Sequence, residues 1–377
     1  MREATQLRII LELLETYKGN EPLSRFLKKY FNLNRQLGSR DRKLIQQFIY
    51  NYFRIGRMYP EKPVQERLAI ANKACRAYTG PLLDYSFKEL KNIDRAASHL
   101  EPDKIFPFGR HLSDSIDKAE FIHSFLVQPR VWIRVRTEFI PLVEKELTEN
   151  EIVFEKDVES GNAWSVKNST SLDQLESFKK GYFEIQDLSS QNTIKLVQPK
   201  PGESWWDACA GAGGKGLMMT AFEPSVKIFC TDTRETILKN LVERFQKAGF
   251  KNFATKVLDL TADRKPVLSN RFDGIIADVP CSGSGTWSRT PEWLTFFDQK
   301  SIVKYQQIQR KIVSNTIRCL TDNKPFIYIT CSVFKEENED NTSWITENLP
   351  LKLQTQMYLE GASSGADTMF VARFLRI

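Results

Sequence analysis

From Pro201 onward, strand-like and helix-like segments alternate along the chain. This alternation predicts a mostly parallel sheet with helices on both faces, so we expect an α/β fold here. Four of the predicted strands end in polar or reactive residues: Asp207, Asp232, Asp278 and the run Thr330-Cys331-Ser332. Ligands of an open parallel sheet bind beyond the carboxyl ends of its strands. We therefore expect these four strand ends to line one cleft.

Residues 5 to about 125 have a helical pattern instead. Leu7, Ile10, Leu11 and Leu14 recur at the spacing of one helix face. Prolines stand where helices would end, because a missing N–H costs least at those positions. We expect an all-helical domain over residues 1–127.

The next segment has a different pattern. Residues 131–136 alternate between apolar side chains and Arg134 and Arg136, which predicts a half-buried strand with a basic outer face. We place a second domain over residues 128–377. Within it we expect a small α+β subdomain over 128–185 and a Rossmann-like core over 186–377.

The charge of the chain is concentrated near its start. Lys and Arg total 54 against 47 Asp and Glu, a formal net charge of +7. The first sixty residues contain 12 basic and 5 acidic side chains, so 12 − 5 = +7 lies there. A basic module beside a neutral one indicates a polyanionic partner, most simply nucleic acid, although surface Lys and Arg also serve solubility alone.

Length and composition exclude several classes of protein. The chain has 377 residues, of which 41% are hydrophobic, so it can bury a large core and is neither disordered nor dependent on disulfides. No apolar run approaches the roughly 20 residues that a membrane-spanning helix needs. Glu3, Arg8 and Glu12 interrupt the segment that a signal peptide would require. We expect a cytoplasmic protein.

The six cysteines include no CxxC pair, and only three histidines are present. This distribution argues against a zinc site, any other metal site or a disulfide framework. We interpret Cys75, Cys230 and Cys319 as small buried hydrophobic residues. Cys281 and Cys331 follow predicted strands and need a separate interpretation.

A turn rich in Gly and Ala follows the strand that ends at Asp207. Such a turn lets backbone N–H groups approach a ligand and directs a helix N-terminus at it. It is not a phosphate-binding loop, because Gly216 follows Lys215 where Ser or Thr is required. Asp232, about 20 residues later, suits the two hydroxyls of a ribose, and Asp259 suits an exocyclic amino group. The pattern indicates a nucleoside-containing cofactor, although each carboxylate could instead cap a helix or lie in a solvated loop.

Cys281 and Cys331 each lie just beyond a predicted strand, 331 − 281 = 50 residues apart. A thiolate that adds to carbon 6 of a cytosine makes carbon 5 nucleophilic enough to take a methyl group from a sulfonium donor. A second group must then remove the carbon-5 proton and allow release of the adduct. Two thiols in one cleft suit this chemistry, and the alternative is a pair of buried structural cysteines.

Several motifs together resemble a known family. They stand in residues 181–191, 207–215, 278–285, 330–339 and 365–370, with Asp278-Val279-Pro280-Cys281-Ser282-Gly283-Ser284-Gly285 and Thr330-Cys331-Ser332 the most specific. In this order they resemble the RNA cytosine-5 methyltransferases of the Fmu/Sun family (RsmB/NOP2/NSUN type). The resemblance implies S-adenosylmethionine as cofactor.

The resemblance also implies roles for individual residues. Cys331 matches the attacking nucleophile, Cys281 the cysteine that releases the product, and Asp278 the residue that bonds and activates the target base. Asp232 and Asp259 match the contacts to the ribose and the adenine. The implied cofactor contacts are Ala208, Cys209, Ala210, Gly211, Gly213, Gly214, Lys215, Asp232, Asp259 and Asp278.

The N-terminal part resembles the NusB-like RNA-binding domain of bacterial 16S rRNA cytosine methyltransferases. The match covers Gly38-Ser39-Arg40-Asp41-Arg42 and the segment 46–54, with its tyrosines and Phe53. A basic domain of this kind attracts RNA phosphates without reading sequence. We expect RNA contacts from Arg40, Arg42, Arg134, Arg136 and Arg289; the alternative for the Arg-Asp-Arg run is a solvated helix start.

These features predict an S-adenosylmethionine-dependent methyltransferase that modifies carbon 5 of a cytosine in RNA, with 16S ribosomal RNA as the expected partner. They do not define the oligomeric state, for which we favour a monomer. Two alternatives stay open: a tRNA cytosine-5 methyltransferase, and an RNA-binding ribosome-assembly factor without activity. An adenine or glutamine amino-group methyltransferase is disfavoured, because it would have an Asn-Pro-Pro-Tyr-like run where Asp278 to Cys281 stand.

Overall fold

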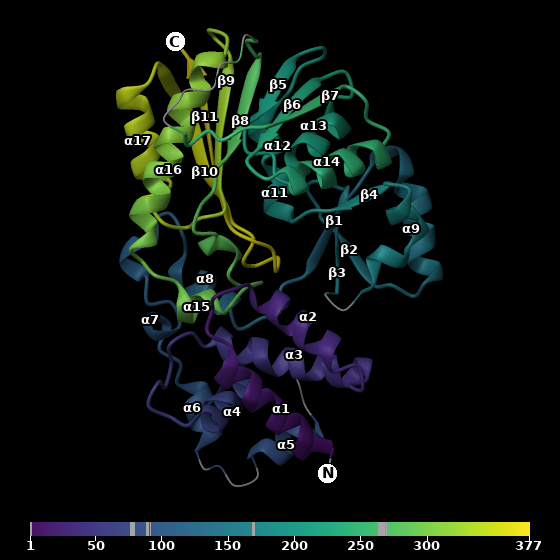
Figure 1. Cartoon of the computed structure of the whole chain (residues 1–377), viewed down its shortest axis with the longest axis vertical. Helices are drawn as coiled ribbons and strands as arrows, with labels where there is room; N and C mark the ends of the chain where they lie inside the picture. Colours follow the sequence, from purple (N-terminus) through teal and green to yellow (C-terminus); the bar gives the residue numbers. More distant parts are fainter. Residues whose placement is uncertain are drawn as a thin grey trace. The chain divides into compact units, whose positions relative to one another are not determined.

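The chain forms two compact units (Figure 1). The computed structural model describes residues 2–75, 80–87, 90, 92–167, 170–262, 268 and 270–377. The helical unit contains residues 1–112, 117–129 and 286–299, and the sheet unit contains 113–116, 130–285 and 300–377. The chain therefore changes unit at 112/113, 116/117, 129/130, 285/286 and 299/300. Residues 286–299, which the sequence placed in the second domain, lie in the helical unit.

The helical unit is built from amphipathic helices, as expected from the apolar spacing. Ile10 and Leu13 on α1 pack with Leu27 on α2 and Phe48 on α3 in one apolar core. Among the described residues its helices are α1 (Arg2–Thr16), α2 (Leu23–Leu33), α3 (Ser39–Arg54), α4 (Val64–Cys75), α5 (Pro81–Phe87), α6 (Ile93–Ser98), α7 (Pro102–Ile105), α8 (Lys118–Ser124) and α15 (Trp293–Phe296). The predicted all-helical start of the chain is confirmed.

A four-stranded antiparallel sheet begins the sheet unit. Its order is β2-β3-β1-β4, and β1 lies between two neighbours. The prediction of a basic outer face on β1 is wrong, because residues 132–135 of this strand are all buried. The strands are β1 (Val131–Val135), β2 (Phe154–Lys156), β3 (Ala163–Val166) and β4 (Phe183–Ile185), accompanied by α9 (Ile140–Glu149) and α10 (Glu176–Lys179).

The second sheet has seven strands in the order β10-β11-β9-β8-β5-β6-β7. Strands β5 to β9 pair in parallel, whereas β11 pairs antiparallel with both β9 and β10. The Rossmann-like fold is therefore confirmed, with an antiparallel edge. The strands are β5 (Ser204–Asp207), β6 (Lys227–Asp232), β7 (Phe253–Val257), β8 (Gly274–Asp278), β9 (Pro325–Thr330), β10 (Leu351–Leu359) and β11 (Met369–Arg376).

Helices cover both faces of this sheet (Figure 1). Successive strand residues point to opposite faces, so Trp205 packs with α13 and α14 while Trp206 packs with α16 and α17. Because β5 pairs with β6 on one side and β8 on the other, the strand order reverses there, which is where such sheets bind ligands. The helices are α11 (Leu188–Asn192), α12 (Ile194–Val197), α13 (Gly214–Phe222), α14 (Glu235–Lys247), α16 (Ser301–Thr316) and α17 (Glu339–Asn348).

Candidate active site

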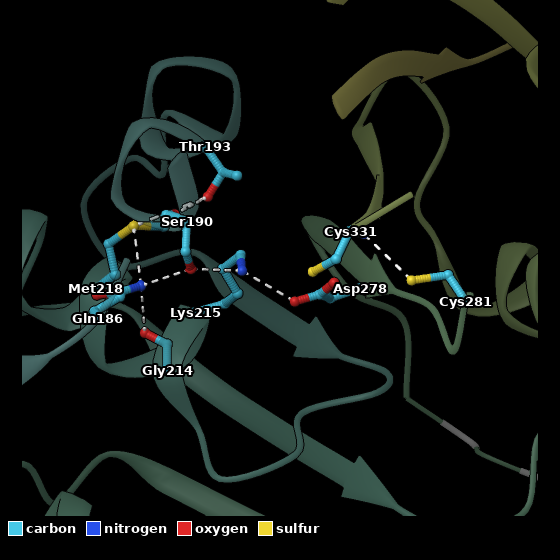
Figure 2. Close-up of polar contacts among 9 residues, drawn as sticks. All are labelled: Gln186, Ser190, Thr193, Gly214, Lys215, Met218, Asp278, Cys281 and Cys331. Atoms are coloured by element: carbon cyan, nitrogen blue, oxygen red, sulfur yellow. Dashed lines mark hydrogen bonds and ion pairs between the residues drawn. The ribbon is translucent and has the colours of Figure 1, made fainter. Parts of the chain in front are cut away.

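The carboxyl ends of β5, β8 and β9 bring three of the expected residues together. Asp207 ends β5, Asp278 ends β8, and Cys331 directly follows β9. Figure 2 shows Cys331 beside Asp278, and Lys215 reaching Asp278 from α13. The cluster lies at the point where the strand order of the sheet reverses, so the fold places reactive groups where a ligand would bind.

A buried ion pair connects the glycine-rich turn to β8. The Nζ of Lys215 donates to Asp278 Oδ2 at 3.0 Å and to Ser190 Oγ at 2.8 Å (Figure 2). Burial alone would lower the pKa of Lys215, but the neighbouring Asp278 carboxylate raises it above its ordinary value. Lys215 therefore stays charged, next to both Asp278 and Cys331.

The two cysteines of interest lie against each other. The backbone N–H of Cys331 donates to Cys281 Sγ at 3.3 Å (Figure 2). The side-chain hydrogen bond between the two cysteines, burial and the Asp278 carboxylate raise the pKa of Cys331, whereas the Lys215 ammonium opposes that rise. Both thiols are free. In this resting arrangement Cys331 is a protonated thiol that must lose its proton before it can act as a nucleophile.

Asp207 stands out because it is buried with few groups to stabilise its charge. Its side chain is 1% exposed, and its carboxylate oxygens have no hydrogen bond of good geometry, although the backbone N–H of Gly216 stabilises the charged form. Burial and the nearby Asp278 raise the pKa of Asp207 to about 7. A buried acceptor of this kind calls for a donor from a ligand, and a positively charged amino group suits it best.

The turn after Asp207 has the backbone shape that a close ligand requires. Gly211 and Gly213 have φ angles of 52° and 81°, in the region that favours glycine. A Cβ on Gly213 would lie 2.7 Å from Leu241 Cγ, so the turn packs tightly on α14. Other expected cofactor contacts in this turn are Ala208, Cys209, Ala210, Gly214 and Lys215, where α13 begins at Gly214.

Asp232 and Asp259, the expected ribose and adenine contacts, lie in different surroundings. Asp232 is 8% exposed, accepts from the Gly211 N–H at 3.1 Å and forms an ion pair with Arg234 at 3.0 Å. Burial would raise the pKa of Asp232, but the hydrogen bonds from Arg234 hold it below its ordinary value. Asp259 is exposed, and Thr261 donates its backbone N–H and its hydroxyl to Asp259 Oδ1. The structure thus joins Asp232 to the glycine-rich turn and leaves Asp259 in a turn of its own.

The expected RNA contacts are divided between the two units. Arg40 is exposed on α3, and Arg42 donates to the carbonyl oxygens of Leu37 and Arg35. Arg289 belongs to the segment 286–299 of the helical unit and is half-buried. In the sheet unit, Arg136 donates to the Ala248 carbonyl and to Glu138.

Arg134 is a correction to the predicted RNA contacts. Its side chain is 5% exposed, and its Nε donates to Gln186 Oε1 at 2.8 Å. Burial lowers the pKa of Arg134 to about 10. Gln186 in turn donates to Ser190 Oγ at 3.1 Å, the same hydroxyl that accepts from Lys215. Arg134 therefore helps to position Gln186 and, through it, Ser190 in the site, and it does not face a phosphate.

Several polar residues of the site had no role in the sequence interpretation. Gln186 and Ser190 connect Arg134 to Lys215, and Glu337 and Asn338 bond the loops of the two cysteines. All four stand inside the motif segments of the sequence, at 181–191 and 330–339, which was the only available signal. Ordinary polar residues gain such a role only through contacts that the fold creates.

Two kinds of feature are absent from the described part of the chain. No group of three or more His, Cys, Asp or Glu side chains is arranged to hold a metal ion there. Within the same residues, no helix has the length and apolar character needed to cross a membrane.

Comparisons with known proteins find matches to the part of this chain that contains the seven-stranded sheet. Residues 194–372 match a family model described as 16S rRNA methyltransferase RsmB/F. The ribosomal RNA small subunit methyltransferase B of Photorhabdus laumondii is 27% identical over 217 residues, which are 56% of this chain and 49% of that protein. The protein of the same name from Yersinia pseudotuberculosis serotype O:1b is 27% identical over 229 residues, covering 59% of this chain and 52% of that protein. The chain thus spans about half the length of the curated relatives it matches.

Solved structures share the fold. The crystal structure of PH0851 matches with a TM-score of 0.72 at 19% identity and covers 97% of both chains. The crystal structure of NSun6 from Pyrococcus horikoshii with SFG matches with a TM-score of 0.62 at 17% identity, covering 69% of this chain and 94% of that one. At these identities the likeness concerns the fold.

Proposed function

We propose that the protein methylates carbon 5 of a cytosine in RNA, with 16S ribosomal RNA as substrate and S-adenosylmethionine as cofactor. The match of residues 194–372 to the family model described as 16S rRNA methyltransferase RsmB/F supports this proposal. The observation that supports this chemistry best is the contact between Cys281 and Cys331 beside the Lys215–Asp278 ion pair. A methyltransferase that modifies an amino group needs neither thiol.

The cofactor fits the residues at the end of β5. S-adenosylmethionine supplies, when bound, a methyl group on a positively charged sulfonium sulfur. Its amino group would give the buried carboxylate of Asp207 a donor of good geometry, and the turn at Gly211 and Gly213 lets the backbone approach the cofactor. Asp232 would accept from the ribose hydroxyls in place of Arg234.

Cys331 is the nucleophile in the proposed reaction. Its thiolate would form a bond to carbon 6 of the cytosine, and the electron pair of the carbon 5–carbon 6 double bond would then bond carbon 5 to the methyl group, while the bond from the methyl group to the sulfonium sulfur breaks and leaves its electron pair on that sulfur. A proton held between Asp278 and N3 of the base would help the ring accept the electron pair of the thiolate, and the Lys215 ammonium would stabilise negative charge nearby. The base must be unpaired or flipped out for Cys331 to reach its face.

Cys281 completes the cycle. After methyl transfer, Cys281 as a thiolate would take the proton from carbon 5, the electron pair of that carbon–hydrogen bond would re-form the double bond, and the sulfur of Cys331 would leave as a thiolate. We assign the support of this release to Cys281 because its sulfur already contacts the backbone of Cys331. A protein without Cys281 should transfer one methyl group and then remain attached to the RNA.

The test compares wild-type protein with Cys331→Ala, Cys281→Ala and the double variant, each incubated with S-adenosylmethionine and cellular RNA. Methyl transfer and covalent adducts on denaturing gels are measured together. We expect no transfer in Cys331→Ala and an RNA-dependent adduct in Cys281→Ala that disappears in the double variant. Turnover in Cys331→Ala would refute the mechanism. The RNA recovered from the adduct identifies the target and separates ribosomal RNA from transfer RNA.

A further inference from the structure

A buried carboxylate connects the loops of the two cysteines. Glu337 is 0% exposed and lies just before α17, outside the cluster around Lys215. Its Oε2 accepts from the backbone N–H of Ser282 at 2.9 Å, and its Oε1 accepts from Ser332 Oγ at 2.6 Å. Ser282 directly follows Cys281 and Ser332 directly follows Cys331, so one side chain bonds the residue after each thiol.

Further contacts fix the position of Glu337 itself. Gln309 on α16 donates its Nε2 to Glu337 Oε2 at 2.8 Å and to the Pro280 carbonyl at 3.1 Å. Tyr328 on β9 donates its hydroxyl to the Glu337 backbone carbonyl at 2.6 Å. Burial raises the pKa of Glu337, and the hydrogen bonds from Ser282 and Ser332 oppose that rise. A buried carboxylate that accepts this many hydrogen bonds has a well-defined place.

The two loops depend on Glu337 to different degrees. The Cys331 loop has additional support, because Thr330 donates its hydroxyl to Asn338 Oδ1 at 2.6 Å and Asn338 donates to the Ser332 carbonyl at 2.8 Å. It also receives the Gly285 N–H at the Cys331 carbonyl, at 2.8 Å. The backbone N–H of Ser282 donates to Glu337, and its hydroxyl contacts Ser332, which Glu337 also holds, and Ser284, whose own hydroxyl lies 3.2 Å from that of Ser332.

We propose that Glu337 is a positioning residue that holds the Cys281 loop against Cys331, so that its loss impairs release of the methylated RNA more than attack on the base. The proposal rests on the proposed function for the two thiols. Glu337 touches neither thiol and so acts through Ser282 and Ser332.

The first test uses turnover. In Glu337→Ala we expect kcat to fall by about 100-fold, because a displacement of about 1 Å in a catalytic group has that effect. KM for RNA should fall together with kcat, because slow release lets the covalent intermediate accumulate, and kcat/KM should stay near the wild-type value. A covalent protein–RNA adduct should accumulate even though Cys281 is present. In Glu337→Gln the amide oxygen can still accept from Ser282 and Gln309, and the Ser332 hydroxyl can turn to accept from the amide nitrogen, so activity should largely return.

The matched control is Glu339→Gln. Glu339 lies two residues along the same segment but accepts from Tyr358 and Ser113 instead of the cysteine loops. We expect turnover and adduct level like those of the wild type. A Glu337→Gln variant as impaired as Glu337→Ala would overturn the proposal, because it would show that the charge matters and not the hydrogen-bonded position.

A second readout does not depend on methylation. Iodoacetamide labelling of folded protein, followed by mass spectrometry of each cysteine peptide, measures how well the loops are held. We expect faster labelling of Cys281 in Glu337→Ala and wild-type rates in the two Gln variants; equal rates in all folded variants would overturn the proposal. If Glu337→Ala does not fold, Ser332→Ala replaces it, because this variant removes one of the contacts of Glu337. It should increase the labelling rate of Cys281 by a smaller amount, and an unchanged rate would refute the proposal. If the wild-type protein methylates no RNA but the variants still show these labelling differences, the result would count against the proposed function alone.

Discussion

Asp207 makes the stability of the protein depend on pH through a single residue. Its pKa in the folded protein is raised to about 7, mainly by burial, whereas an unfolded Asp has a pKa of about 4. The folded state therefore holds this proton more tightly than the unfolded chain. The resulting stabilisation is fully present below pH 4 and is lost as the pH rises to about 7, by about 1.4 kcal/mol per pH unit.

The variant Asp207→Asn tests this assignment, since an amide cannot lose the proton. The free energy of unfolding of the variant, relative to wild type, should increase from pH 4.5 to 7 and then level off, as measured by urea unfolding without ligand. Under the proposed function the variant should also bind S-adenosylmethionine about tenfold more weakly, because a charged hydrogen bond is lost. A difference between variant and wild type that is constant across pH would contradict the raised pKa.

Cys331 should react slowly at neutral pH because only its thiolate is nucleophilic. Its pKa is raised by the hydrogen bond with Cys281, by burial and by Asp278. The rate of alkylation at Cys331 should therefore keep rising about tenfold per pH unit above pH 8.5, where free cysteine levels off. Mass spectrometry of the Cys331 peptide over pH 7–10, with free cysteine as the reference, measures this. A plateau at or below pH 8.5 would contradict the prediction.

Individual side chains differ in how far the sequence could place them. Asp278 and Cys331 could be brought to one edge of a sheet from the sequence alone, because parallel strands align their carboxyl ends. Arg134 could not be placed, since the alternation of residues in a strand does not say whether both faces are covered. Gln186, the residue that accepts its hydrogen bond, lies 52 residues away in the chain.

Among the elements, the turn between β5 and α13 depends on Gly213. A side chain there would need a left-handed backbone and would also overlap Leu241 and Phe245 on α14. We expect Gly213→Ala to lower the free energy of unfolding by about 3 kcal/mol. The matched control is Gly202→Ala, since Gly202 has a similar φ of 76° but no atom near its would-be Cβ, and we expect about 1 kcal/mol. Equal losses in urea unfolding would show that overlap with α14 contributes nothing.

The sequence predicts those strands that a local run of apolar residues marks. It does not predict how strands from distant segments pair. Strands β5, β6, β8 and β9 follow from runs of apolar residues that end at polar ones. The pairing of β11 with both β9 and β10 depends on contacts between distant segments, which no local pattern encodes. The antiparallel edge of the sheet was accordingly missing from the sequence interpretation.

At the scale of the whole molecule, the division into units cannot be reproduced by one cut in the chain. Residues 286–299 follow the Cys281 motif in sequence but fold into the helical unit. Within that unit, Arg54 is 1% exposed and donates to the carbonyl oxygens of Phe125 and Ser288, at 2.8 and 2.9 Å. The sequence offered no sign of this, because a short segment with aromatic residues is compatible with either core.

The segment 286–299 completes the core of the helical unit. The ring of Phe296 packs against Tyr17 and Phe53, with centroids 5.5 and 5.8 Å apart. Glu292, which is 1% exposed, accepts the backbone N–H of Leu23 at 3.0 Å and so satisfies a donor in the first turn of α2. A fragment of residues 1–129 lacks these groups, so it would leave a buried donor unpaired and an apolar surface exposed.

We therefore expect the 1–129 fragment to melt at a lower temperature than the helical unit of the intact protein and to bind a hydrophobic dye. A synthetic peptide of residues 286–299 should raise its melting temperature in a saturable way, because a ligand that binds only the folded state stabilises it by about 2.7 kcal/mol at 100 times its Kd. The control peptide has Glu292→Ala and Phe296→Ala and should have little effect. A fragment that melts at the temperature of the intact unit, and whose melting temperature changes with neither peptide, would show that the core of the helical unit is complete without residues 286–299.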